Sequence, residues 1–302
     1  MNKLHQIIAT ALLVSIALFT SQAGAITRTV DCDKGQSIQN ALEKGQSNAE
    51  PLVINVRGTC DESVTIARDD VTLLGIGENA GISSTTDISV SIEGGQRIRI
   101  ENLTLSGPDI PLSVDSAYVT LVNVTVEGSN DNGIDAVDGA HINIEESRIR
   151  NNGLDGIIIE KGGTLDLYNT VVSGNGRAGV GLSKNSSSVI TNSEISGNLT
   201  GPGVSISENS TAKFEGTTVI SGNGANGINI LSHSFANVFS PTVISGNGQN
   251  GLFLALDSGS EIIGPVTIGD NANAAVYCND AESSIAIQDY SNINQAVACT
   301  GF

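Results

Sequence analysis

The chain has 302 residues, with 32 acidic and 14 basic side chains and a formal net charge of -18. This charge excludes a nucleic-acid-binding module, because contacts with phosphates require clustered cations. A hydrophobic content of 39% with only 15% charged residues excludes an intrinsically disordered chain.

The N-terminal segment 1–25 has the pattern of a secretory signal peptide. Lys3 provides a positive start, residues 7–19 are apolar, and residues 23–25 (Ala-Gly-Ala) match a small-residue cleavage site. The apolar run is shorter than the ~20 residues that span a bilayer, and no later run reaches that length, so we expect no transmembrane span in the mature chain. The mature chain is predicted to be secreted, periplasmic or at the cell surface after cleavage.

A short helix is predicted inside an N-terminal cap of about residues 26–51. Ser37 is a favourable helix N-cap residue, and Gly45 is a stop signal. Ile38, Ala41 and Leu42 share one face of this helix. We expect this apolar face to cover the start of the core that follows.

Four cysteines in an exported chain allow three disulfide pairings. Their spacing favours Cys32–Cys60 and Cys278–Cys299, with one bridge near each end of the chain. Each bridge closes a short loop and would contribute about 3 kcal/mol of stability. A metal site at these cysteines is disfavoured, because the sequence has no Cys-x-x-Cys motif or nearby pair of histidines.

A repeat with a period of about 23 to 24 residues occupies most of the chain. Glycines that open short segments of alternating apolar residues recur once in each period: Gly156, Gly179, Gly203, Gly227 and Gly251. A second column, of apolar residues, has nearly the same spacing: Ile100, Leu121, Ile144, Leu167, Ile190, Phe214, Val238 and Ile262. Such alternation is typical of a strand with one buried face, and the short segments leave no room for a helical repeat.

A third column consists of asparagines in tight turns: Asn152, Asn175, Asn198, Asn223, Asn247 and Asn271. Asn tolerates the left-handed region and forms hydrogen bonds with nearby backbone, which suits it to turns. Identical Asn side chains one coil apart can also bond to each other as a ladder. One period therefore holds three short strands separated by turns, and we predict three parallel sheets around a shared core.

The recurrent motif Gly-Asn-Gly-x-x-Gly-Ile-x-Ile and the asparagine turns resemble the right-handed parallel β-helix repeats of the pectate-lyase-like superfamily, over residues 52–289. We therefore expect an all-β fold, a right-handed single-stranded parallel β-helix of about ten coils with a short N-terminal capping helix. Residues 26–302 are expected to form one domain, with a C-terminal cap at about 283–302. This superfamily includes lyases, hydrolases, epimerases, adhesive fibres and non-enzymatic repeats, so the resemblance leaves the activity open.

The densest cluster of charged residues occupies three neighbouring coils. Elimination from a uronate needs a base and a group that neutralises the carboxylate, and four residues are candidates for catalysis: Asp135, Asp155, Lys161 and Arg177. Two more residues in the cluster are candidates for contacts with a ligand: Asp131 and Glu160. Carboxylates are preferred ligands of Ca²⁺, and three aspartates are candidates for such a site: Asp131, Asp135 and Asp155.

Several observations favour a structural interpretation of this cluster. Asp138 and Lys161 are one repeat period apart, which predicts an ordinary ion pair between adjacent coils. The Asn-Thr-Asp, Asp-Asp and Gly-His-Gly motifs of polygalacturonase-like hydrolases are missing, as is the Asp-Pro-His-Asp motif of mannuronan epimerases. Neither His141 nor His233 has a visible catalytic partner. No Lys or Arg follows Lys213.

Two aromatic residues farther along the chain are candidates for stacking on a sugar: Phe253 and Tyr277. Both are expected to point outward from neighbouring coils. The alternative is that the C-terminal cap folds over them, and this alternative is favoured.

The leading hypothesis is an exported β-helix repeat protein that serves as a non-catalytic surface or glycan-associated scaffold, with a polysaccharide or cell-surface glycan as partner. The alternative is a polysaccharide lyase or glycoside hydrolase with an acidic, Ca²⁺-assisted site on an outer sheet. A third class, a self-associating adhesive fibre, is disfavoured by the predicted caps at both ends.

Overall fold

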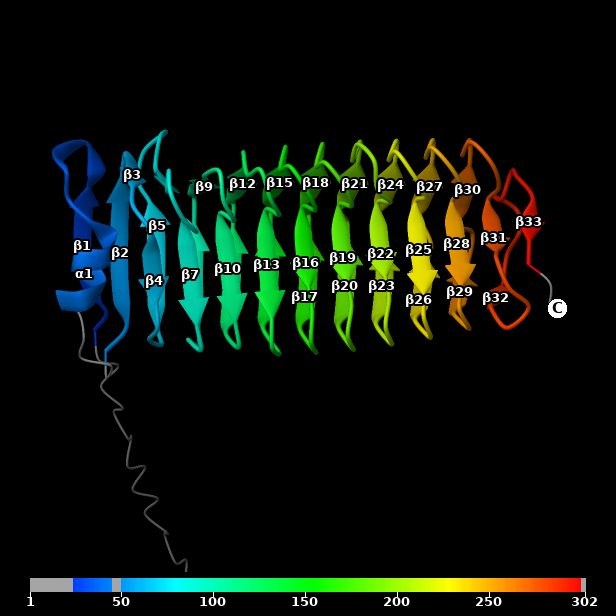
Figure 1. Cartoon of the computed structure of the whole chain (residues 1–302), viewed down its shortest axis with the longest axis horizontal. Coiled ribbons are helices and arrows are strands. Elements are labelled where there is room, and N and C mark those ends of the chain that lie inside the picture. Colours follow the sequence, from blue (N-terminus) through cyan, green and yellow to red (C-terminus); the bar gives the residue numbers. More distant parts are fainter. Residues whose placement is uncertain (1–23, 45–49, 300–302) are drawn as a thin grey trace, which may run out of the picture.

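The computed structural model describes residues 24–44 and 50–299, which form a rod built from three parallel sheets (Figure 1). Strands that succeed one another in a sheet lie side by side along the long axis, from the blue N-terminal end to the red C-terminal end. The predicted parallel β-helix is therefore confirmed. The predicted signal peptide lies outside the described residues except for its last two, and it stays a prediction.

The first sheet has twelve strands, in the order β1 (Ile26–Asp31), β2 (Leu52–Arg57), β5 (Val71–Gly75), β8 (Ile98–Glu101), β11 (Tyr118–Val122), β14 (His141–Glu145), β17 (Thr164–Tyr168), β20 (Ser187–Thr191), β23 (Thr211–Glu215), β26 (Phe235–Phe239), β29 (Gly259–Ile263) and β32 (Ser284–Ile287). The second has ten short strands, β3 (Thr59–Asp61), β6 (Gly81–Ser83), β9 (Thr104–Ser106), β12 (Thr125–Glu127), β15 (Arg148–Arg150), β18 (Val171–Ser173), β21 (Glu194–Ser196), β24 (Val219–Ser221), β27 (Val243–Ser245) and β30 (Thr267–Gly269).

The third sheet has eleven strands, β4 (Val64–Ile66), β7 (Val90–Glu93), β10 (Leu112–Asp115), β13 (Ile134–Val137), β16 (Ile157–Ile159), β19 (Val180–Leu182), β22 (Val204–Ile206), β25 (Ile228–Leu231), β28 (Leu252–Ala255), β31 (Val276–Cys278) and β33 (Val297–Ala298). The twelve strands of the first sheet correspond to about twelve coils, more than the ten expected. The numbers differ because β1 precedes residues 52–289, and because the eleven strands from β2 to β32 enclose ten intervals of one coil each. The early coils vary in length, since Leu52 pairs with Val71, 19 residues later, and Thr72 pairs with Arg99, 27 residues later.

The core consists of the inward residues of all three sheets, stacked in columns. Leu167 lies opposite Ile190 in the register of β17 and β20, as the repeat predicted, and both are buried. The residues that alternate with the buried ones along each strand point outward, so Thr164 and Asp166 of β17 remain partly exposed. Each fully buried Leu or Ile contributes about 1.5–3 kcal/mol relative to an exposed one, and the sum over the columns holds the sheets together.

A buried ladder of asparagine side chains runs along the turns that follow the second sheet. Asn175 Nδ2 donates to Asn198 Oδ1 (3.0 Å), and Asn198 Nδ2 donates to Asn223 Oδ1 (2.8 Å). The backbone N–H of Asn175 also donates to Asn198 Oδ1 (3.1 Å). The same pattern continues to Asn271, whose Nδ2 donates to Gln295 Oε1 (3.4 Å). The ladder predicted from the sequence is confirmed. It supplies hydrogen-bond partners to side-chain amides that would be costly to bury without them.

The N-terminal end is closed by a 3-10 turn, η1 (Cys32–Lys34), and by helix α1 (Ile38–Lys44), which is the predicted capping helix. Ile38, Ala41 and Leu42 are buried, as predicted. Ser37 acts as the N-cap, since its Oγ accepts a hydrogen bond from the N–H of Asn40 (3.1 Å). The predicted stop at Gly45 lies outside the described residues.

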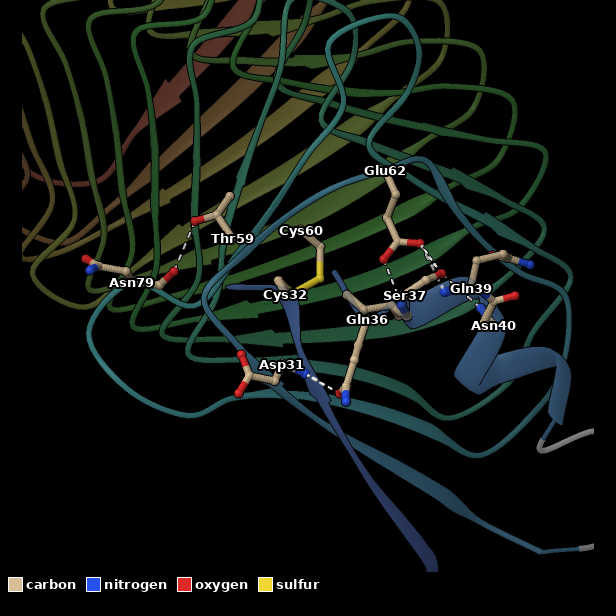
Figure 2. Close-up of a disulfide and its surroundings, with 11 residues drawn as sticks. Asp31, Cys32, Gln36, Ser37, Gln39, Asn40, Thr59, Cys60, Glu62 and Asn79 are labelled. Carbon is tan, nitrogen blue, oxygen red and sulfur yellow. Dashed lines mark hydrogen bonds between the residues drawn. A yellow bond between two sulfur atoms is a disulfide. The ribbon is translucent and has the colours of Figure 1, made fainter. Parts of the chain in front are cut away.

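Glu62 fastens the start of α1 to the next coil (Figure 2). Its carboxylate accepts hydrogen bonds from Ser37 Oγ (2.7 Å), from the N–H of Ile38 (2.7 Å) and from the N–H of Gln39 (3.3 Å). These N–H groups belong to the first turn of the helix, where they have no partner within the helix itself. The disulfide Cys32–Cys60 lies beside this contact and ties the same two segments together, as the spacing predicted.

The C-terminal end is closed differently, without a helix among the described residues. The disulfide Cys278–Cys299, also predicted, joins β31 to the end of the chain, and β33 pairs with β31 as one more rung. Gln295 Nε2 donates to the carbonyl of Asn271 (2.5 Å), which completes the ladder. Within residues 24–44 and 50–299, no helix combines the length and apolar character that crossing a membrane requires.

Replacing Asn198 by Ala is expected to lower the free energy of unfolding by about 2–3 kcal/mol, because the buried N–H and Nδ2 of Asn175 both lose Asn198 Oδ1 as an acceptor. Chemical denaturation measures this change. The control is Asn237→Ala on the outer face of β26, which should change stability by about 0.5 kcal/mol or less. Equal effects of the two substitutions would contradict a structural role for the ladder.

Replacing Glu62 by Ala is expected to weaken the cap by about 1–2 kcal/mol, because three donors at the start of α1 lose their acceptor. Hydrogen exchange should show faster exchange at Ile38 and Gln39, while protection in β17 stays the same, since coils contact only their neighbours. Glu78→Ala, at an exposed turn, serves as the control. Unchanged exchange in α1 would disprove this anchoring role.

Candidate functional site

A groove of about 320 Å³ lies on the outer face of the third sheet, over β16, β19 and β22. Its floor is formed by three residues that are register partners in successive strands, Ile158, Gly181 and Ser205. These positions belong to the outward column of the sheet, and Gly181 is the one without a side chain. The groove therefore forms where the outward column lacks a side chain, at Gly181.

Turns and strand ends form the two walls of the groove. One wall contains Asp155, Arg177 and residues 200–202, which precede the strands. The opposite wall contains Glu160, Ser183 and Ser207, which follow them.

The first wall is raised by a turn that is one residue longer than its neighbours. Gly203 is the fifth residue after Asn198, whereas Gly179 is the fourth after Asn175 and Gly227 is the fourth after Asn223. The added length places Thr200 at the groove, with its Oγ1 donating to the carbonyl of Gly176 (2.7 Å).

Asp155 is the most buried charged side chain of the groove, with 6% of its side chain exposed. Its Oδ1 accepts a hydrogen bond from the N–H of Ala178 (2.7 Å), and its Oδ2 lies 3.5 Å from Arg177 Nη1. Burial raises the pKa of Asp155, and the hydrogen bond from Ala178 and the charge of Arg177 oppose this rise. The carboxylate thus holds the turn through Ala178 and lies beside a guanidinium that is 62% exposed.

Asp135 lies one strand from the floor, opposite Ile158 in the register of β13 and β16. The pKa of Asp135 is raised to about 6, mainly by burial and also by the negative charges of Asp131, Glu160 and Asp155. A hydrogen bond donated by Asn132 Nδ2 to Asp135 Oδ1 (3.0 Å) acts in the opposite direction. Asp135 is therefore close to half-protonated near pH 6.

Two ion pairs between adjacent coils involve other charges of the cluster. Lys184 Nζ lies 2.6 Å from Glu160 Oε2 and is the main reason that the pKa of Glu160 is lowered. Lys161 Nζ lies 3.3 Å from Asp138 Oδ1, as their spacing of one period predicted. Both pairs are substantially exposed, so each is worth about 0–1 kcal/mol.

The structure divides the predicted site residues into two groups. Asp155, Glu160 and Arg177 line the groove together, whereas Asp135 lies beside it and Lys161 pairs elsewhere with Asp138. In the described part of the chain, no group of three or more His, Cys, Asp or Glu side chains is arranged to hold a metal ion. Ca²⁺ binding by the three aspartates therefore stays a prediction from the sequence.

The two outward aromatic residues stack on each other, with the rings of Phe253 and Tyr277 5.9 Å apart and inclined by 19°. The expectation that the C-terminal cap folds over them was wrong. Instead, Ala298 of β33 takes the next position in the same column, and Tyr277 stays 40% exposed. A strand added as one more rung extends the sheet, so it lies beside the column and leaves its outer face open.

His141 and His233 both lie away from the groove. His141 belongs to the first sheet, where it stacks on Tyr118 (ring centroids 4.2 Å apart) and lies 3.6 Å from Asp166. His233 lies in a turn, 3.8 Å from Asp257.

Most residues that line the groove carry no charge, so a search for charged residues did not identify them. Gly181, Ser183, Ser205 and Ser207 occupy the outward columns that the repeat predicts, but they carry no charge and were not selected as site residues. Two signals in the sequence mark them. One is a glycine at an outward strand position, and the other is the longer spacing from Asn198 to Gly203.

Known proteins provide an independent comparison. A family model described as a right handed beta helix region matches residues 112–264, which is about half of the chain. The mannuronan C-5 epimerase AlgE4 A-module of Azotobacter vinelandii is 17% identical, with a TM-score of 0.63 over 88% of this chain and 87% of that chain. An alginate lyase from Paenibacillus sp. is 13% identical, with a TM-score of 0.59 over 88% and 98%.

The enzymatically active domain of tailspike protein 2 from Bacteriophage CBA120 is 13% identical, with a TM-score of 0.66 over 82% of this chain and 44% of that chain. At these identities the similarity shows the fold, including its right-handed winding. No protein of curated function matches the sequence.

Replacing Asp135 by Asn is expected to raise the free energy of unfolding at pH 7 by about 1–2 kcal/mol, after allowance for solvent screening. The carboxyl of Asp135 has a pKa of about 6 in the folded state, compared with 3.8 for an unperturbed aspartate. The folded state therefore binds the proton more tightly than the unfolded state does. Wild-type stability is therefore lost as the pH rises from about 4 to about 6, and the variant does not show this loss.

Urea unfolding at pH 4, 5, 6 and 7 measures this difference between Asp135→Asn and the wild type. The control is Asp138→Asn, which removes an exposed ion pair and should not stabilise the protein at pH 7. A difference for Asp135→Asn that is the same at pH 4 and pH 7 would be inconsistent with the raised pKa.

Proposed function

The chain belongs to the right-handed β-helix family, and from this premise we propose that it is an exported scaffold that binds a glycan in the groove over β16, β19 and β22. The observation that carries the proposal is the composition of the groove. An apolar floor at Ile158 is bordered by the hydroxyls of Thr200, Ser205 and Ser207. Sugars present apolar ring faces edged by hydroxyl groups, and sites for small ligands typically combine apolar surface with a few polar groups.

A binding role without catalysis is supported by the charges at the groove. Arg177 and Lys184 are each already paired with a carboxylate, and the hydrogen bond to Glu160 raises the pKa of Lys184. A cation in such a pair makes a poor general base, because a base must release its proton near the working pH. Elimination of the kind proposed from the sequence would lack its base at these positions.

The disulfides support export of the protein. Cys32–Cys60 and Cys278–Cys299 account for all four cysteines. Structural disulfides form and persist in oxidising compartments, such as the periplasm or the cell exterior. Together with the predicted signal peptide, they favour a location where polysaccharides are accessible.

The proposal is tested by filling the groove. Ser205→Trp places a large ring over the floor and is expected to abolish binding on a glycan array, measured with and without Ca²⁺. The matched control is Ser113→Trp, which lies in the same outward column four strands away. Wild-type protein that binds no glycan, or equal binding by both variants, would contradict a glycan site in this groove.

A second function, glycoside hydrolysis, is favoured by one observation, the raised pKa of Asp135. A carboxyl group with a pKa of about 6 is suited to protonate a leaving group, and hydrolysis pairs such an acid with a second carboxylate, for which Asp155 in the wall of the groove is a candidate. Release of reducing ends from a polysaccharide panel, lost in Asp135→Asn and in Asp155→Asn but kept in Asp138→Asn, would establish hydrolysis and replace the scaffold proposal.

A further inference from the structure

We propose that the side chain of Ile158, which lies over the buried Gly181, forms a flat platform that binds the apolar face of a single neutral pyranose ring, and that Gly181 is the residue that determines this specificity. The inference rests on the proposed glycan-binding function and names the ligand class of the same groove. It depends on the local geometry of β16 and β19, independently of any catalytic role for the acidic residues nearby.

The backbone conformation at position 181 does not require a glycine. It lies inside β19, and its φ is outside the left-handed region that favours glycine. Glycine inside a strand is destabilising by roughly 0.5–1 kcal/mol relative to Ala, and it often marks a place where another group approaches the backbone closely. Here that group is the side chain of Ile158.

Ile158 lies across the surface of the next strand because Gly181 leaves the space open. A Cβ atom at position 181 would be 2.6 Å from Ile158 Cδ1, well inside van der Waals contact. Any side chain at this position would therefore push Ile158 away from the sheet and into the groove. The glycine keeps the floor both apolar and flat.

The rim of the platform presents mainly hydrogen-bond acceptors. Ser207 Oγ donates to the carbonyl of Leu182 (3.4 Å) and Thr200 Oγ1 donates to the carbonyl of Gly176, so each oxygen faces the ligand with lone pairs. The carboxylate of Glu160 adds a charged acceptor on one wall. Sugar hydroxyl groups are donors that match such a rim.

The charge of the groove disfavours a uronic acid. The lining contains two carboxylates, Asp155 and Glu160, against the one guanidinium of Arg177, and the chain as a whole carries a formal net charge of -18. The two cations beside these carboxylates, Arg177 and Lys184, are already paired with them, so a uronate carboxylate would have to compete with Asp155 and Glu160 for a cationic partner. A neutral sugar has no carboxylate and therefore needs no cationic partner in the groove.

The size of the groove suits one ring at the platform. A volume of about 320 Å³ is near the lower end of the roughly 300–1,000 Å³ that ligand sites typically enclose. Neighbouring sugars of a chain would extend over the adjacent strands, which are spaced by ~4.8 Å. One sugar ring at the platform would therefore make most of the contacts with the protein.

The experiment compares the wild type with Gly181→Ala by isothermal titration calorimetry. The probes are three neutral tetrasaccharides (cellotetraose, mannotetraose and tetra-N-acetylchitotetraose) and two acidic ones (tetragalacturonate and tetramannuronate). We expect at least one neutral probe to bind, neither acidic probe to bind more tightly, and Gly181→Ala to weaken binding at least tenfold. Thermal denaturation should show that Gly181→Ala is as stable as the wild type or more stable.

The matched control is Gly259→Ala. Gly259 is also a strand glycine with an ordinary φ, and a Cβ there would be 2.8 Å from Phe235 Cδ2, again the side chain of a residue one strand away. It lies on the first sheet, so Gly259→Ala should keep full affinity. Ile158→Ala provides a second test, since it removes the apolar floor without filling the groove and should also weaken binding at least tenfold.

The outcomes separate this inference from the proposed function. Binding of a neutral probe that is unchanged in Gly181→Ala and Ile158→Ala would overturn the platform, while a glycan site elsewhere in the groove would survive. Tighter binding of an acidic probe would overturn the ligand class. Absence of binding by the wild type to all five probes and to a glycan array would overturn both proposals.

Discussion

The structure depends on one constraint, which is that equivalent residues of successive coils lie directly beside each other in register. Backbone pairing fixes this register within each sheet, and the buried asparagine ladder fixes it at a turn, because each amide needs its counterpart one coil away. The ladder tolerates coils of unequal length, since the step in sequence number is 23 from Asn175 to Asn198, 25 from Asn198 to Asn223 and 24 from Asn223 to Asn247. Additional residues are therefore confined to turns between the fixed points, where they alter the surface and leave the core unchanged.

The same constraint explains what the sequence could predict. The pairing of Leu167 with Ile190, the asparagine ladder and the ion pair of Lys161 with Asp138 all follow from spacing alone, because a column in the sequence is a column in space. Features that depend on the direction of a side chain could not be read in this way. The groove was missed because it arises from the way Ile158 leans over Gly181, which periodicity does not describe.

The ends of the chain were predictable to different degrees. The helix at the N-terminal end follows from local signals at Ser37 and Ile38, but its fastening by Glu62 requires a carboxylate to arrive from the next coil. At the other end, local signals specify no helix, and the segment around β33 adds a rung beside Tyr277. Whether such a segment covers a surface or extends it is decided by tertiary packing, which a pattern of residues does not encode.

The longer turn between Asn198 and Gly203 illustrates how such a molecule acquires new properties. Its one added residue reshapes the outer surface of a single coil, while Ile195 and Val204 on either side stay buried in their columns. Turns in this architecture can consequently diversify one by one, much as loops on an antibody framework do, without a cooperative change of the whole. A surface of this kind offers a natural starting point for engineering recognition, with each circuit of the chain as a separately adjustable module.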